Sequence, residues 1–161
     1  MESLAAAIEN TALHTWVETT ALLWPILEIV HFIGLSALLG SMLLIDLRLV
    51  GFYRHIDVAA TQKLLPIAAI GFGMNLMSGT LFVFGDPTRY LANTGFILKL
   101  ILILLAGMNA IWFGRKIKPL MKTWQPNAEM PVLAKVIACI SLGTWFGVLL
   151  LGRLIPYVST G

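Results

Sequence analysis

Two ionisable side chains, Glu28 and His31, lie within a segment that is long and apolar enough to cross a lipid bilayer. The segment, residues 21–45, reads ALLWPILEIVHFIGLSALLGSMLLI. Residues three apart on an α-helix share a face, so the carboxyl group and the imidazole can meet each other or a common partner. Because an ionisable group inside a bilayer is costly, the pair suggests a functional site.

A neutral imidazole inside a membrane protein is a good ligand for haem iron, copper or zinc. A carboxylate that accepts a hydrogen bond from Nδ1 can hold the ring with Nε2 facing the metal. We therefore expect haem b in the helix bundle, with His31 as its axial ligand and Glu28 as the orienting partner. Two alternatives stay open: a transporter or channel-like subunit in which Glu28 and His31 relay protons or bind Cu(I) with Met77, and a structural scaffold whose buried polar groups only join helices.

Four further residues extend this candidate site. Asn75 needs a polar partner within the bundle, and the thioether of Met77 suits Cu(I) or haem iron. Lys99 lies about one turn inside the third apolar segment, and Arg153 lies near the end of the fourth. Both cations are expected on the same side of the membrane as Glu28, where they can pair with carboxylates such as haem propionates.

The chain has three histidines, and His14 and His55 both lie outside the apolar segments. The charge pattern described below places them on opposite faces of the membrane. Two histidines of one chain are therefore not expected to bracket a haem. The sixth ligand would be a methionine, a group from another subunit, or absent.

The elements that position these residues are four apolar segments, at about 21–45, 64–85, 93–114 and 131–155. With 58% hydrophobic and only 12% charged residues among 161, the composition excludes an ordinary soluble domain. Segments of this length satisfy their backbone hydrogen bonds within the bilayer as helices. We predict an all-α fold, with residues 1–161 forming one four-helix membrane domain. Leu4, Ile8 and Trp16 recur at helical spacing and predict a short N-terminal interfacial helix.

Basic residues gather in the connections between the first and second segments and between the third and fourth. The positive-inside rule then places both termini on the opposite, periplasmic side of a bacterial inner membrane. We interpret the net charge of +3 as topology, so no nucleic-acid partner is expected.

Expected partners are the lipid bilayer, a redox partner and further copies of this chain. Pairs of small residues four apart, Ser36 with Gly40 and Gly143 with Gly147, form grooves in which helices can approach closely and favour homo-oligomers. The sequence contains no conventional hydrolase, metalloprotease or phosphate-binding motif. If the protein is redox-active, it is expected to be a cytochrome-like electron carrier.

The strings LEIVHFIGLSALLGSMLLIDLRLVG, GDPTRYLANTGFILKL and SLGTWFGVLLLGRLIPY resemble an uncharacterised bacterial family of small four-helix integral membrane proteins. The resemblance covers nearly the whole chain and implies the four-helix fold, but no particular activity. Its most specific positions are Glu28, His31, Asp46, Arg48, Gly152, Arg153 and Tyr157. More loosely, the layout is similar to the membrane domains of copper-resistance proteins and small b-type cytochromes.

Overall fold

The structure, a computed structural model, describes residues 2–121 and 129–157, and every regular element in these ranges is helical. Four helices are long and apolar enough to cross a membrane. They are α3 (Leu23–Val50), α5 (Leu65–Gly85), α7 (Thr94–Lys116) and α9 (Val132–Leu154). The all-α fold with four candidate spans is therefore confirmed.

Shorter helices lie at the two ends of these spans. They are α1 (Glu2–Glu9), α2 (Ala12–Thr19), α4 (Val58–Thr61), the 3₁₀ turn η1 (Gln62–Leu64), α6 (Pro87–Leu91) and α8 (Lys118–Met121). The predicted N-terminal helix is present but divided into α1 and α2. The division falls at Thr11, whose extended backbone ends one helix while its hydroxyl accepts a hydrogen bond from the His14 backbone N–H at 3.2 Å and caps the next.

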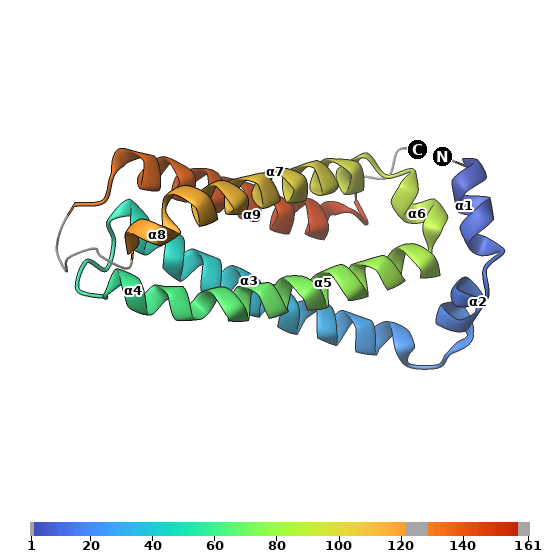
Figure 1. Cartoon of the computed structure of the whole chain (residues 1–161). Helices are drawn as coiled ribbons and strands as arrows, with labels where there is room; N and C mark the ends of the chain where they lie inside the picture. The colour runs from blue at the N-terminus through green and yellow to red at the C-terminus, as the bar shows by residue number, and fades with distance from the viewer. Residues whose placement is uncertain (1, 122–128, 158–161) are drawn as a thin grey trace.

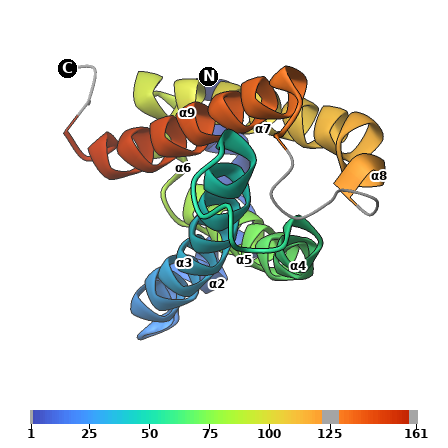
Figure 2. The same cartoon turned by 90° about the vertical axis from the view of Figure 1, so that its left-hand side faces the viewer.

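The long helices form two antiparallel pairs, α3 with α5 and α7 with α9, and α3 packs against α9 to join them. Figure 1 shows the α7/α9 pair above the α3/α5 pair, and Figure 2 shows the first pair crossing over the second. The helices α1, α2 and α6 lie at one end, together with the end of α9, and α4 and α8 lie at the other. We call these the terminal end and the basic end.

The basic end holds the main hydrophobic core. Its buried side chains come from α3, α4, α8, α9 and the short connections, and side chains near the start of α5 and the end of α7 pack against them. The largest fully buried apolar members are Ile45, Leu49, Met121 and Ile137. All four spanning helices are thus fixed relative to one another at this end.

Helix α3 continues five residues beyond the predicted end of the first span because Arg48 finds partners within the protein. Its guanidinium donates to the backbone oxygens of Ile56, at 2.6 Å, and Arg54, at 3.3 Å. Among the described residues, Arg48 forms no ion pair with Asp46, which lies two residues earlier on the same helix. The carboxyl group of Asp46 instead accepts a hydrogen bond from the hydroxyl of Ser141 on α9.

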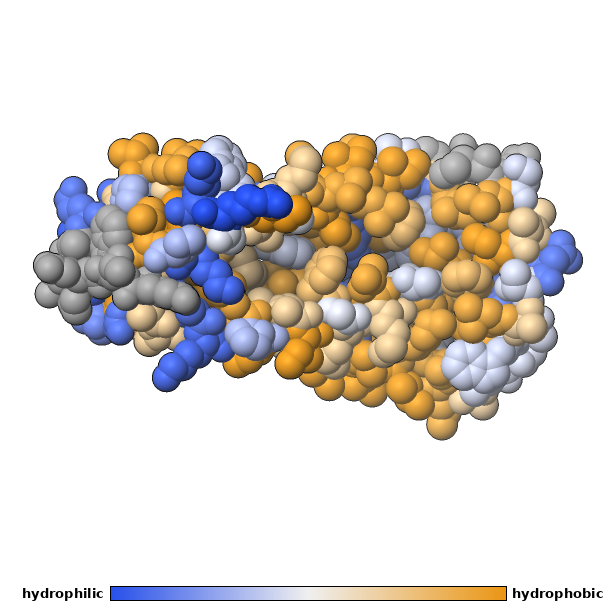
Figure 3. Space-filling view, viewed as in Figure 1, coloured by the Kyte–Doolittle hydropathy of each residue, from blue (hydrophilic) through white to orange (hydrophobic). Residues whose placement is uncertain are grey.

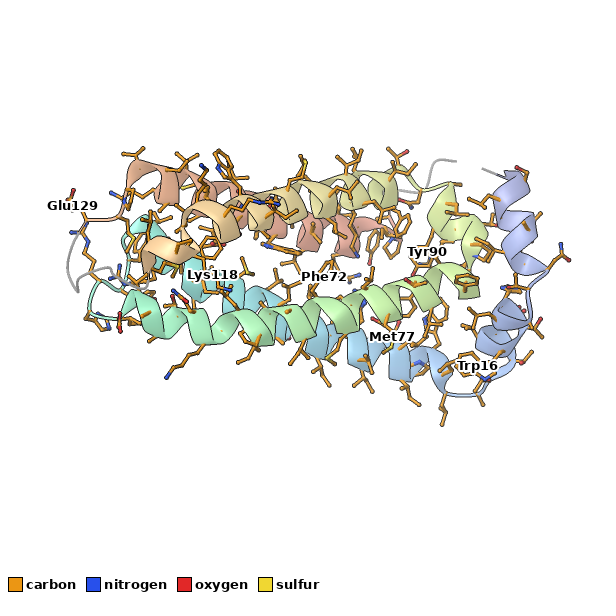
Figure 4. The ribbon with its side chains drawn as sticks, in the orientation of Figure 1. Trp16, Phe72, Met77, Tyr90, Lys118 and Glu129 are labelled. Atoms are coloured by element: carbon orange, nitrogen blue, oxygen red, sulfur yellow. The ribbon has the colours of Figure 1, made fainter. Side chains whose placement is uncertain are left out.

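The outer surface of the long helices is apolar, as expected of a chain surrounded by lipid. Figure 3 shows orange, hydrophobic atoms over the middle of the molecule and blue, hydrophilic atoms concentrated toward the basic end. In Figure 4, Lys118 and Glu129 lie at the basic end and Trp16 at the terminal end. The polar regions therefore flank an apolar middle, the pattern that a bilayer requires.

Candidate functional site

His31 lies in the half of the molecule nearer the terminal end, on the side of α3 that faces α5. Its Nδ1 lies 2.8 Å from the Ser78 hydroxyl oxygen. That hydroxyl donates its own hydrogen to the backbone oxygen of Met74, at 2.7 Å. With the Ser78 hydrogen used in that bond, the contact is satisfied by the tautomer in which Nδ1 donates to Ser78. In this tautomer the ring carries its free electron pair on Nε2, and no hydrogen bond from a described residue reaches that atom.

The position of His31 depends on a close approach of α3 and α5 one turn away. A Cβ atom added to Gly71 would lie 2.6 Å from the backbone oxygen of Gly34, so the two backbones are nearly in contact. Asn75 supports this contact, because its amide donates to the oxygen of Gly71 at 2.9 Å and lies against Gly34. Asn75 is therefore a helix-packing residue next to the site.

A cluster of aromatic rings, led by Phe82, lies on the terminal side of the imidazole. The ring of Phe82, one turn after Ser78 on α5, lies 5.6 Å from that of His31. Phe82 also contacts Trp24 on α3, at 5.1 Å, and Tyr90 on α6, at 6.5 Å. Figure 4 shows Tyr90 between the two helix pairs. These contacts link α3, α5 and α6 around the histidine.

Tyr90 carries the aromatic cluster to α7, since its ring lies 5.4 Å from that of Phe96. Burial raises the pKa of the Tyr90 phenol, and the nearby Arg89 only partly opposes this shift. The phenol is therefore neutral across the physiological range. Glu28 lies close enough to act electrostatically on Tyr90.

Glu28 itself is exposed and forms no ion pair with a described residue. The expected hydrogen bond from His31 Nδ1 to Glu28 is not formed, because Ser78 takes that place. The spacing of three residues brings Glu28 and His31 near one face of α3, but the orienting partner of the imidazole comes from α5.

The two predicted cations lie on the second helix pair. Lys99 of α7 packs beside α9, with its ammonium group 3.3 Å from where a Cβ of Gly152 would stand. It also lies near enough to act electrostatically on His31, and it has no carboxylate partner among the described residues. Arg153 lies farther out, with its guanidinium 5.6 Å from the ring centre of Tyr157. The structure thus places Lys99 within electrostatic range of the histidine and Arg153 farther out.

Three other candidate ligands are separate from His31. The side chain of Met77 is 57% exposed on the outside of α5. His14 donates to the backbone oxygen of Phe84 at the terminal end, and His55 is exposed at the basic end. Within residues 2–121 and 129–157, no three His, Cys, Asp or Glu side chains come together as a metal site.

The residues that sequence reasoning missed are Phe82 and Tyr90. Ser78, the orienting partner of His31, was also not assigned to the site from the sequence. The available signal was spacing, since Met74, Ser78 and Phe82 recur every four residues and must share one face of α5.

Comparisons with known proteins give no relative from which a role could be transferred. The chain matches no protein-family model, no curated protein sequence and no solved structure.

Proposed function

We propose that this protein binds haem b in the terminal half of its membrane domain, with Nε2 of His31 as the axial ligand. One observation carries the proposal: the hydrogen bond from Nδ1 to Ser78 leaves the electron pair of Nε2 free. Histidines that bind metals usually donate their other ring N–H in this way, because the hydrogen bond fixes the tautomer and the ring orientation. Ser78 takes the role expected of Glu28.

The surroundings of His31 also suit a flat macrocycle with acidic side chains. The ring of Phe82 lies 5.6 Å from the imidazole on its terminal side, and Tyr90 stacks on Phe82. Lys99 supplies a positive charge within electrostatic range of the histidine, and Arg153 supplies another toward the terminal end. Both can pair with propionate groups that face the headgroup region.

A bound haem would supply one-electron redox chemistry or a site for a diatomic ligand. Within the described residues no second histidine lies near His31, so the protein provides one axial ligand from histidine. We infer a role in electron transfer or haem-linked sensing. The positive-inside rule supports placing the site in the periplasmic half of a bacterial inner membrane, with both termini periplasmic. A homo-oligomer and a redox partner remain expectations from the sequence.

The test is the absorption spectrum of the purified protein in detergent, alone and after addition of haemin, before and after reduction with dithionite. We expect a Soret band and reduced α and β bands from the wild-type protein and their loss in a His31→Ala variant. His55→Ala is the matched control, since that histidine is exposed at the other end, and it should bind haem normally. A wild-type protein that gains no Soret band with haemin would overturn the proposal.

A second measurement, of copper content, distinguishes haem binding from the copper-handling alternative. Copper that the wild-type protein retains and that both His31→Ala and Met77→Ala variants lose would favour a copper site. The exposure of Met77 on the outside of α5 does not support such a site. If His31→Ala lowers only stability, without changing a bound chromophore or copper content, the residue has a scaffold role.

A further inference from the structure

Three buried polar atoms near the basic end have no hydrogen-bond partner among the described residues. They are Oδ2 of Asp46, Nε2 of Gln62 and Oδ1 of Asn109. The side chains of Asp46 and Asn109 are only 2% and 7% exposed. Buried polar atoms are almost always paired, so three unpaired atoms in one part of a protein call for a physical explanation.

The antiparallel register of α3 and α5 places Gln62 level with Asp46. His31 meets Ser78, and Gly34 meets Gly71, across this helix pair. Continuing that register along α3 brings Asp46 opposite residues 59–63, which include Gln62 just before α5 begins.

Helix α9 brings Asn109 to the same depth. The amide of Asn109 donates to the backbone oxygen of Ile137 at 3.0 Å. In an α-helix that oxygen faces the N–H group four residues later, which belongs to Ser141. The hydroxyl of Ser141 in turn hydrogen-bonds to Asp46. Asp46 and Asn109 are thus linked through one turn of α9, and Gln62 lies at the same depth. We call Asp46, Gln62, Asn109 and Ser141 the Asp46 layer.

The charged groups on the surrounding elements do not neutralise Asp46. Arg48, on the same helix, donates to the carbonyls of Ile56 and Arg54. Lys135 of α9 lines a small pocket at the basic end together with Arg48, Arg54 and Glu129. Lys63 of η1 and Arg115 of α7 are exposed. An ionised Asp46 would therefore be a buried negative charge without a cation, which is strongly unfavourable.

We propose that the Asp46 layer is a buried proton-binding site in which Asp46 is a neutral carboxylic acid. The burial of Asp46 and the lack of a cation beside it support a proton. Its carboxyl group is 2% exposed and hydrogen-bonds to Ser141, while Oδ2 is buried without a partner among the described residues. A hydrogen on Oδ2 removes the negative charge that would otherwise be buried there. One proton therefore replaces a buried charge by a neutral acid.

A sodium ion is the competing occupant of this layer. It would neutralise the Asp46 carboxylate, but hard cations require more oxygen ligands than Asp46 and Ser141 offer. The small number of oxygen ligands therefore favours the proton.

The chain offers a direct test, because it contains three aspartates and the other two are helix N-caps. Asp57 accepts from the Ala59 N–H, and Asp86 accepts from the Arg89 N–H, so asparagine can replace both without loss of the caps. In the Asp57→Asn/Asp86→Asn protein, a ¹³C label on the aspartate carboxyl carbon reports Asp46 alone. We expect an isotope-shifted infrared band of a protonated acid at neutral pH in sodium-free buffer.

Two outcomes would overturn the proposal. One is a carboxylate band with no acid band at neutral pH, and the other is an acid band that sodium chloride converts to a carboxylate band while potassium chloride does not. Neither outcome bears on haem binding, because His31 lies in the other half of the chain's membrane domain.

Stability provides a second measurement that uses Asp46→Asn, a neutral analogue of the acid. The folded state holds a proton that the unfolded chain releases at neutral pH, so the wild-type midpoint of thermal unfolding should fall as the pH rises. We expect this fall to be smaller in Asp46→Asn than in the control Asp57→Asn. Equal pH dependence in the two variants would contradict the proposal, and failure of Asp46→Asn to fold leaves the labelled experiment as the deciding one.

Discussion

The two halves of the membrane domain differ in how their four spanning helices pack. At the basic end all four spanning helices contribute to one apolar core, next to the Asp46 layer. Toward the terminal end the helices separate into two pairs, which face each other through aromatic and polar side chains such as Phe72, Tyr90 and Lys99. The comparison indicates that one half holds the fold together, while the other leaves a histidine nitrogen free to bind a ligand.

The largest expected effect is the loss of stability from a cavity at the basic end. Ile137 is 1% exposed, and its replacement by alanine should destabilise the protein by about 2–5 kcal/mol, because the surrounding helices cannot close the space. Unfolding in detergent, followed by circular dichroism, measures the change. On the same helix Ile140 is 41% exposed, and Ile140→Ala should change stability by less than about 0.5 kcal/mol. Equal losses at the two positions would remove the distinction between core and lipid-facing surface.

The contact between α3 and α5 is tested by two nearby glycines. Gly71→Ala should cost about 1–3 kcal/mol, because the new methyl group would meet the backbone of Gly34 and force the helices apart. A Cβ at Gly73 meets no atom within 4 Å, so Gly73→Ala should leave stability unchanged or raise it by up to about 1 kcal/mol. Thermal unfolding of the two variants checks the prediction, and a loss in Gly73→Ala as large as in Gly71→Ala would contradict it.

The fold could be predicted from sequence because it depends on a pattern that the chain carries locally. Twenty or so apolar residues specify a spanning helix by length alone, and short connections make neighbouring helices antiparallel. The ends of α3 were less predictable. The helix continues through Arg48 because loop carbonyls bind the guanidinium, and these carbonyls are brought near only when the chain folds.

The candidate site could be predicted only in part, because its contacts join residues that come near one another only when the chain folds. An ionisable group within an apolar segment identified His31, but its partner depends on the register between two helices. That register is set by the close approach of Gly34 and Gly71, whereas the sequence analysis expected close packing at Ser36 with Gly40 and at Gly143 with Gly147. A Cβ at Gly40 or Gly143 would meet no atom of the described protein within 4 Å, whereas a Cβ at Gly147 would lie 2.6 Å from Cδ1 of Leu102 on α7.

The hydrogen bond to His31 is tested by Ser78→Ala. We expect haem affinity to fall about 10-fold to 100-fold, since the loss of a partner to the ligand's other nitrogen usually has an effect of that size. Thr80→Ala is the control, because Thr80 is exposed and donates only to the backbone oxygen of Leu76 on its own helix. Titration with haemin measures both affinities. Normal affinity in Ser78→Ala would show that the serine does not orient the ligand.

The smallest expected effect concerns the attachment of the N-terminal helices to the terminal end. The backbone oxygen of Phe84, at the end of α5, has no intrahelical donor and accepts from Nδ1 of His14 at 2.8 Å. His14→Ala should therefore cost about 0.5–1.5 kcal/mol, the net value of one such hydrogen bond. The loss should appear as faster amide hydrogen exchange in α1 and α2, with α7 and α9 unchanged. His55→Ala, at the basic end, should leave exchange in α1 and α2 unaltered. If His14→Ala also leaves it unaltered, then the apolar contacts of α2, such as Val17 against Gly85, hold the segment in place without the hydrogen bond.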